Sequence, residues 1–183
     1  NRKAGAINSS LQHQFSKEDY VVVNINSEAS SRRLTVSKAV ELLNLLRSSI
    51  QQNIILIGAP KEKEFVDSVV SLLQNTTNIE NMAGSTSLPQ LSQLLASAQV
   101  MLTTDSGPAH LANALGTHTI VLFGAGRESN TAPYNKNLRN IIRLGELSCE
   151  PCEKNICTRY ETPQCLERLD SYKIIETVKL HLN

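Results

Sequence analysis

Residues 100–126 read VMLTTDSGPAHLANALGTHTIVLFGAG, and this stretch decides the fold. Val100–Leu102 is a short apolar run typical of a strand, and Thr119–Phe123 is a second one. Between them, Ser106 can cap a helix, and Gly116 is the kind of residue that ends one. The stretch therefore predicts a β-α-β unit that closes on a glycine-rich loop. Its two loops follow parallel strands and lie at the same edge of a sheet, where ligands bind in such folds.

The start of this predicted helix is a candidate anion site. Free N–H groups and the helix dipole favour an anion at Ser106, and Gly107 lets a phosphate approach the backbone. The Asp105 carboxylate would repel a pyrophosphate, so we expect it to cap the turn or to accept hydrogen bonds from sugar hydroxyls. His110 lies about one helical turn further and can face the same opening. Spacing alone leaves an alternative open, in which these residues are helix caps and a surface histidine.

Composition sets limits on the class of protein. The 183 residues suffice for one domain with a sizeable core, with 40% hydrophobic and 19% charged residues. The formal net charge of +1 gives no reason to expect nucleic acid as a partner. No apolar run approaches the length of a membrane span, and we expect no signal peptide. The chain begins with Asn1, from which we expect a processed or excised piece of a larger protein.

Strands and helices alternate through most of the chain. Further strands are predicted at Tyr20–Ile25, Asn53–Ile57, Ile79–Met82 and Ile141–Leu144, and a closing helix at Ser171–Leu182. This order predicts an α/β, Rossmann-like domain with a mostly parallel sheet and helices on both faces. The domain would span residues 20–183. Residues 1–19 are polar and are interpreted as a linker or a remnant of a preceding domain.

Two arginines precede the first predicted helix. Arg32 and Arg33 follow the first strand, and Thr35 can cap the helix after them. Guanidinium groups beside hydroxyl groups and a helix N-terminus suit a phosphate. The alternative is a pair of solvated arginines.

All four cysteines lie within one segment. Cys149, Cys152, Cys157 and Cys165 have the spacing C-x2-C-x4-C-x7-C. Zinc, reduced structural thiols and disulfides all remain open, and zinc is not favoured because zinc ribbons usually carry two C-x2-C pairs.

The run DSGPAHLANALG at 105–116, followed by VLFG at 121–124, resembles the signature of the bacterial heptosyltransferases. These are the ADP-heptose:lipopolysaccharide transferases of glycosyltransferase family 9, which have the two-domain GT-B fold. The resemblance extends from about Val21 to the C-terminus. It therefore covers only the second, nucleotide-sugar-binding half of such an enzyme.

The resemblance implies a donor-binding domain of a glycosyltransferase that moves a sugar, in this family heptose, from a nucleotide diphosphate to a lipopolysaccharide-core or other glycan acceptor. The donor would be ADP-heptose, with no further cofactor. The partners would be the N-terminal domain of the same enzyme, which supplies the catalytic base, and a glycolipid at the membrane surface. The location would be cytoplasmic, with peripheral contact to the inner membrane. No catalytic residue is expected in this chain.

The resemblance also implies which residues meet the donor. A basic residue binds phosphate in the family, but the aromatic and proline that usually follow it are Leu34 and Thr35 here, so the choice between Arg32 and Arg33 stays open. Glu62 would reach the nucleoside, although its alternative role, in the first turn of the following predicted helix, is to complement the helix dipole. The expected donor-binding residues are Arg32, Glu62, Thr86, Asp105, Ser106, Gly107 and His110.

Two alternatives to a transferase remain. A sugar-nucleotide epimerase shares the GT-B architecture, but it needs a different acid–base set and this segment offers only one histidine at the candidate site. A non-catalytic nucleotide-binding module is the other alternative.

Overall fold

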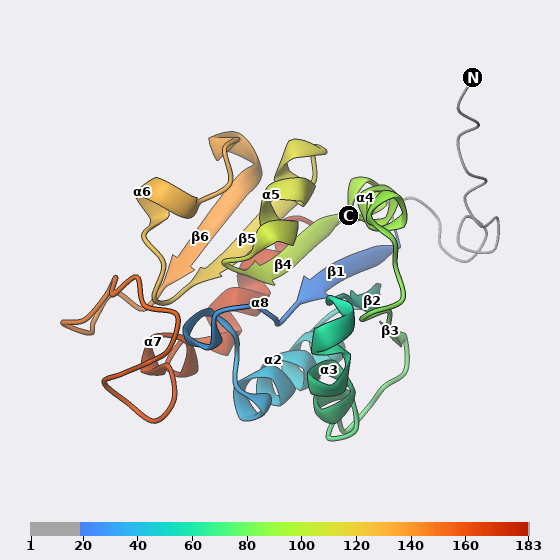
Figure 1. Ribbon diagram of the computed structural model, residues 1–183. Coiled ribbons are helices and arrows are strands. Elements are labelled where there is room, and N and C mark those ends of the chain that lie inside the picture. Colours follow the sequence, from blue (N-terminus) through green and yellow to red (C-terminus); the bar gives the residue numbers. More distant parts are fainter. Residues whose placement is uncertain (1–18, 183) are drawn as a thin grey trace.

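The computed structural model describes residues 19–182, which form one six-stranded sheet with helices on both sides (Figure 1). The strands are β1 (Tyr20–Asn24), β2 (Asn53–Leu56), β3 (Ile79–Asn81), β4 (Val100–Thr104), β5 (His118–Phe123) and β6 (Arg139–Arg143). The α-helices are α2 (Val36–Ser49), α3 (Lys63–Val70), α4 (Leu88–Ser97), α5 (Gly107–Ala114), α6 (Glu128–Thr131), α7 (Gln164–Glu167) and α8 (Ser171–Lys179). The 3-10 turns are η1 (Ser30–Arg32), η2 (Pro60–Glu62) and η3 (Lys136–Leu138).

The sheet has the strand order β3-β2-β1-β4-β5-β6, and every one of these pairs is parallel. The Rossmann-like α/β prediction is therefore confirmed. The predicted linker at 1–19 lies, except for Asp19, outside the described residues. In the part of the chain that is described, no helix is both long and apolar enough to cross a membrane.

The central strands are buried and mainly apolar, because helices cover both faces of the sheet. Along β1, Val21 and Val23 point to one face and pack with α2, α3 and α8. Tyr20 and Val22 point to the other face and pack with α4 and α5. Figure 1 shows these two helical layers on either side of the sheet. A run such as YVVVN, buried at every position, is what a strand between two layers requires.

The direction of the strand order reverses between β1 and β4. The chain passes from β1 to β2 on one side and from β4 to β5 on the other, so the loops that follow these two adjacent strands diverge. A crevice forms at such a switch point, outside the carboxyl ends of the strands. The fold thus places η1 and the start of α5 on opposite sides of one opening.

Local signals set most of the helix ends. The Thr35 side chain accepts a hydrogen bond from the Lys38 N–H at 3.2 Å and caps α2, as predicted. Gly116 follows α5 with φ of +90°, a left-handed conformation that glycine adopts without strain. Ser106 is the N-cap residue of α5, as predicted, but its side chain makes no capping hydrogen bond. Its hydroxyl donates instead to the Thr104 carbonyl oxygen at 3.1 Å.

Stacked histidines join β5 to the end of the chain and predict a pH dependence of stability. The His118 and His181 rings stack with centroids 3.5 Å apart, and each Nε2 lies within 3.0 Å of Asn140 Oδ1. Burial, with a contribution from His118, lowers the pKa of His181. The unfolded chain therefore takes up this proton more readily than the folded one, and acid favours unfolding. We expect the His181→Gln variant to lose less unfolding free energy than the wild type as the pH falls from about 7.5 to 5, a range that spans the usual histidine pKa.

Denaturant unfolding at several pH values measures this slope. His110→Gln is the matched control, because His110 is exposed on α5. A slope that His181→Gln leaves unchanged would show that this pair does not contribute.

Candidate nucleotide-binding site

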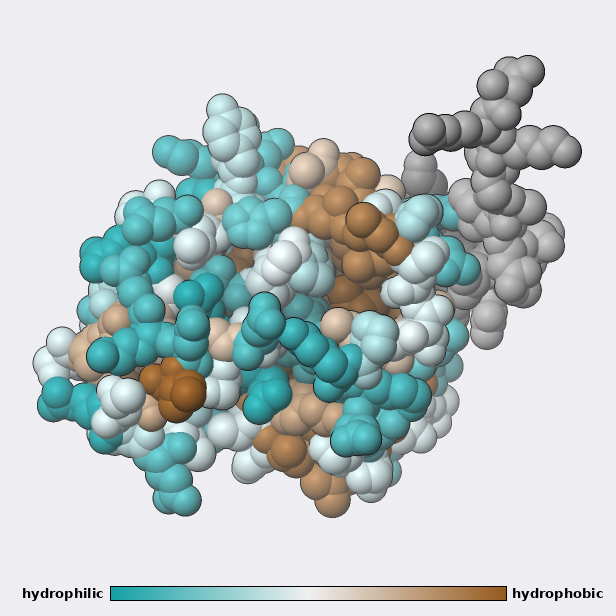
Figure 2. All heavy atoms as spheres, viewed as in Figure 1, coloured by the Kyte–Doolittle hydropathy of each residue, from teal (hydrophilic) through white to brown (hydrophobic). Residues whose placement is uncertain are grey.

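A cleft of about 940 Å³ opens at the carboxyl edge of the sheet. The loops after β1, β2, β3 and β4 line it, together with two residues of the cysteine-rich segment. Its polar wall includes Asn24, Asn26, Ser27, Arg32, Asp105, Ser106 and Asn155, and its apolar wall includes Ile57, Pro60, Leu88 and Leu91. In Figure 2 the face that carries η1, α6 and the cysteine-rich segment is mainly hydrophilic, whereas a hydrophobic area lies over α4 and α5.

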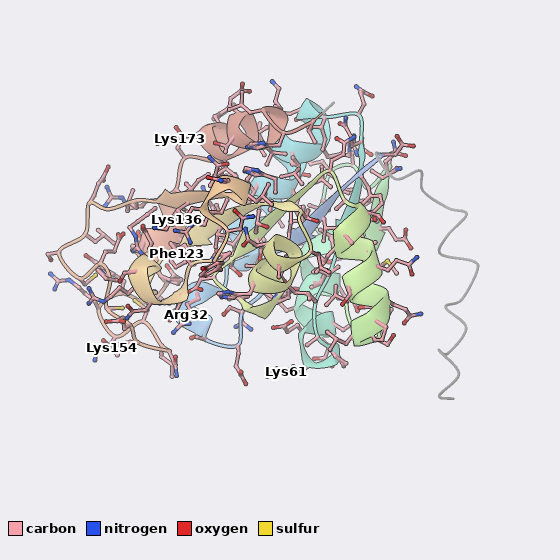
Figure 3. The ribbon with its side chains drawn as sticks, turned by 90° about the horizontal axis from the view of Figure 1, so that it is seen from above. Arg32, Lys61, Phe123, Lys136, Lys154 and Lys173 are labelled. Carbon is pink, nitrogen blue, oxygen red and sulfur yellow. The ribbon has the colours of Figure 1, made fainter. Side chains whose placement is uncertain are left out.

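Arg32 is the arginine that reaches the cleft. It is the last residue of η1, and its Nη1 lies 3.6 Å from Asp105 Oδ2. Its Nε is buried and has no hydrogen-bond partner among the described residues. The neighbouring Arg33 turns away and stacks its guanidinium over the Phe65 ring, 4.9 Å from the centroid. Along the edge of the sheet Arg32 lies between Lys61 and Lys154 (Figure 3).

Asp105 is buried directly after β4, with 4% of its side chain exposed. Its Oδ2 faces Arg32 and accepts a hydrogen bond from the Thr131 hydroxyl at 3.3 Å. Burial raises the pKa of Asp105, and the Arg32 guanidinium opposes this shift by favouring the charged form. A Cβ at Gly126 would lie 2.1 Å from Oδ2, so the glycine makes room for this carboxylate. Asp105 therefore holds Arg32 in place rather than capping the turn.

The N-terminus of α5 forms the opposite wall. The first N–H groups of an α-helix have no partner within the helix, and the dipole adds positive charge there. Gly107 begins α5, and a Cβ at this position would meet no atom within 4 Å. Space for an anion thus lies directly over the backbone. The Asn24 side-chain amide donates to the Ser106 hydroxyl at 2.8 Å and ties this turn to β1.

Glu62 and Thr86 line the same cleft on the side of β2 and β3. Glu62 was predicted to lie in the first turn of the following helix, but it ends η2 and precedes α3. Its Oε2 accepts a hydrogen bond from the Ala59 N–H at 2.7 Å. Pro60 favours this tight turn because its fixed φ suits the first turn of a helix.

His110 is the predicted site residue that does not line the cleft. It is exposed, because the buried side of α5 is formed by Ala109, Ala112 and Asn113. His110 lies close enough to the site to lower the pKa of Asp105 against the larger rise caused by burial.

Two asparagines at the end of β1 were not predicted. Asn24 and Asn26 are 4% and 1% exposed and line the cleft. Asn26 donates to the Ile57 carbonyl oxygen at 3.0 Å, while its Oδ1 has no partner among the described residues. The available signal was the pair of asparagines that interrupts the apolar run YVVVNIN. Asn155 and Ile156 were also missed, because no local pattern links them to the cleft.

The four cysteines line one small cavity of about 20 Å³ beside α7. All four are free thiols, and in residues 19–182 no group of three or more His, Cys, Asp or Glu side chains is arranged to hold a metal ion. Burial raises the pKa of Cys165 to about 12, so this thiol stays protonated at neutral pH. Gly124 packs against it, since a Cβ there would lie 2.9 Å from Cys165 Sγ.

The fold and the cleft together define a Rossmann-type α/β domain with an anion-competent site at its switch point. The chain belongs to glycosyltransferase family 9, the heptosyltransferase family, whose model matches residues 4–162.

Among curated relatives, the chain is 34% identical over 134 residues to the lipopolysaccharide core heptosyltransferase OpsX of Haemophilus influenzae, a match that covers 72% of the chain and 37% of the relative. It is 28% identical over 136 residues to lipooligosaccharide heptosyltransferase 2 of Campylobacter jejuni, with 73% and 42% covered. The chain thus spans about two fifths of the length of these relatives.

Solved structures share the fold. The Escherichia coli ADP-heptose lipopolysaccharide heptosyltransferase II superposes with a TM-score of 0.76 at 23% identity, over 94% of this chain and 49% of that one. The E. coli heptosyltransferase WaaC, solved with ADP, gives a TM-score of 0.69 at 20% identity, over 93% and 47%.

Proposed function

We propose that this chain is the donor-binding domain of a heptosyltransferase-like enzyme and that its cleft holds a nucleotide sugar by the diphosphate. The observation that carries this proposal is that Arg32 and the N-terminus of α5 line the same cleft from opposite sides. The Arg32 guanidinium lines the cleft and can donate to phosphate oxygens. The free N–H groups of α5 suit the same group.

The nucleoside extends from the phosphates toward β2 and β3. Ile57, Leu88 and Leu91 offer apolar surface for the base on that side, and Glu62 can accept hydrogen bonds from ribose hydroxyls. Adenine is the favoured base, since the related WaaC was solved with ADP.

The chemistry of this domain is stabilisation of the leaving group. Negative charge develops on the diphosphate as the sugar departs, and Arg32 and the α5 dipole are fixed beside it before the reaction begins. Asp105 keeps the guanidinium in position. Because its carboxylate is buried against Arg32 and Thr131, Asp105 is unsuited to deprotonate an acceptor.

The base and the acceptor site belong, in this proposal, to a second domain of the same enzyme. The support is that the relatives are more than twice as long as the part matched here. The acceptor is a glycolipid of the lipopolysaccharide core, met by a cytoplasmic enzyme at the membrane surface. No resident metal is assigned, and the four cysteines serve local structure.

A transfer assay tests this division of roles. The chain alone is expected to bind the donor but to release no ADP from ADP-heptose in the presence of a lipopolysaccharide-core acceptor. The full-length protein is expected to transfer the sugar. Chromatography of the reaction products measures both. Transfer by the chain alone would refute the assignment of the base to another domain.

A further inference from the structure

The cysteine-rich segment returns to the cleft after β6 and supplies part of its wall. Asn155 and Ile156 line the cleft together with Arg32. The segment is fixed there by backbone contacts, because the Asn155 carbonyl oxygen accepts hydrogen bonds from the Ser31 N–H at 3.2 Å and from the Ser30 hydroxyl at 3.3 Å. The Ser31 hydroxyl donates to the Lys154 carbonyl oxygen. The wall is thus attached to η1, the turn that carries Arg32.

A second set of contacts fixes the same segment to the loop after β5. The Glu153 N–H donates to the Ala125 carbonyl oxygen at 2.8 Å, and the Glu153 carboxylate pairs with Arg127 at 2.9 Å. The small cysteine cavity lies directly behind, since Ser31 and Ala125 line it too. Packing around the thiols therefore supports both points to which the wall is attached.

The position of the cysteine-rich segment along the edge of the sheet determines whether it faces the nucleoside end or the distal end of a bound donor. The loops after β2 and β3, which carry Glu62 and Thr86, lie on one side of β1, and the loop after β5 lies on the other. Figure 3 agrees, because Lys61 and Lys154 lie on opposite sides of Arg32. A diphosphate on Arg32, with its nucleoside toward β2, directs its distal substituent toward residues 153–156.

The two side chains of the wall have the chemistry to meet a sugar. The side-chain amide of Asn155 makes no hydrogen bond to any other described residue and can both donate to and accept from hydroxyl groups. Ile156 is 67% exposed, although it is apolar and lies in the more polar part of the cleft. The C–H face of a pyranose would cover such a side chain and remove its apolar surface from water.

We propose that Asn155 and Ile156 form the wall of the subsite for the donor sugar, with the amide on its hydroxyls and the aliphatic side chain on its ring. This inference rests on the proposed function, because it takes the diphosphate to lie on Arg32. It assigns the cysteine-rich segment a part in sugar selection rather than in phosphate binding.

The test compares ADP with ADP-heptose in titrations of the wild type and of the Asn155→Ala/Ile156→Ala double variant. The double variant is expected to lose about tenfold in affinity for ADP-heptose, the scale of one or two lost contacts, while its affinity for ADP changes less than about twofold. Asn137→Ala/Leu180→Ala is the matched control, since both residues are exposed and lie outside the cleft.

The outcomes distinguish failure of the sugar wall from failure of the proposed nucleotide site. Absence of ADP binding by the wild type would refute the proposed function itself. Binding of ADP-heptose that the double variant leaves unchanged, with ADP still bound, would refute the sugar wall alone. An equal loss for both ligands would also refute it, because the segment would then act on Arg32 through η1. Thermal unfolding of each variant shows whether the fold is retained, and Asn155→Ala alone serves where the double variant is unstable.

Discussion

Replacing Arg32 with alanine is expected to weaken ADP binding by about 1.5–3 kcal/mol, which is roughly a ten- to hundredfold loss, and to leave adenosine binding nearly unchanged. The reason is that Arg32 lines the cleft, and a guanidinium can contact two phosphate oxygens at once. Adenosine has no phosphate and so does not use this contact. Parallel calorimetric titrations with the two ligands measure the difference.

Arg33→Ala is the matched control for this experiment. The two residues are neighbours with the same charge, but the Arg33 guanidinium lies over Phe65 on the side of α3. The control is expected to keep ADP affinity and to lose only the contact with the ring. Equal weakening of ADP and adenosine in Arg32→Ala, or a larger effect in Arg33→Ala, would remove Arg32 from the phosphate site.

Replacing Gly126 with alanine is expected to damage both the stability and the phosphate site. Its Cβ would lie 2.1 Å from Asp105 Oδ2, so the buried carboxylate must move away from Arg32 and Thr131. Crowding of this kind typically costs about 1–3 kcal/mol of unfolding free energy. ADP affinity should fall as well, because Arg32 loses the partner that positions it. Denaturant unfolding and calorimetry measure the two effects.

Gly107→Ala provides the contrast. A Cβ there meets no atom within 4 Å, so the unfolding free energy should stay unchanged or rise slightly. ADP affinity should still fall, because the methyl group occupies the space over the α5 N-terminus that the phosphate needs.

One result for Gly126→Ala would contradict this account. If that variant has the unfolding free energy and the ADP affinity of the wild type, then Asp105 does not depend on this glycine, and the positioning role of the carboxylate is wrong.

The fold could be predicted from the sequence because the central strands β1, β2, β4 and β5 are buried on both faces. Runs such as YVVVN and NIIL carry that burial in their composition, and the turn and cap residues between them mark the helix ends. The sequence pattern that marks a strand is weaker where the strand is only partly buried. The edge strand β6 begins at Arg139 rather than at Ile141, because its first residues are polar and pair with β5 alone. The four-residue helix α7 is too short to show a helical period.

The candidate site could be predicted only where local chemistry defines it. The anion-competent start of α5 and the basic turn η1 each follow from a few adjacent residues. The choice between Arg32 and Arg33 depends on Phe65, which lies on another helix. Asn155 and Ile156 reach the cleft only because residues 153–156 bind to η1 and to the loop after β5. Such contacts between distant segments leave no pattern in the sequence.

The central claim is that the cleft between β1 and β4 holds a nucleoside diphosphate. Titration calorimetry of the chain with ADP, UDP and GDP tests it most directly. We expect saturable binding with ADP preferred, and a lower affinity at high salt because the contact with Arg32 is electrostatic. Preference for UDP would favour a sugar-nucleotide enzyme of another kind. No binding of any of the three up to roughly millimolar concentration, an affinity of about −4 kcal/mol, would contradict the claim.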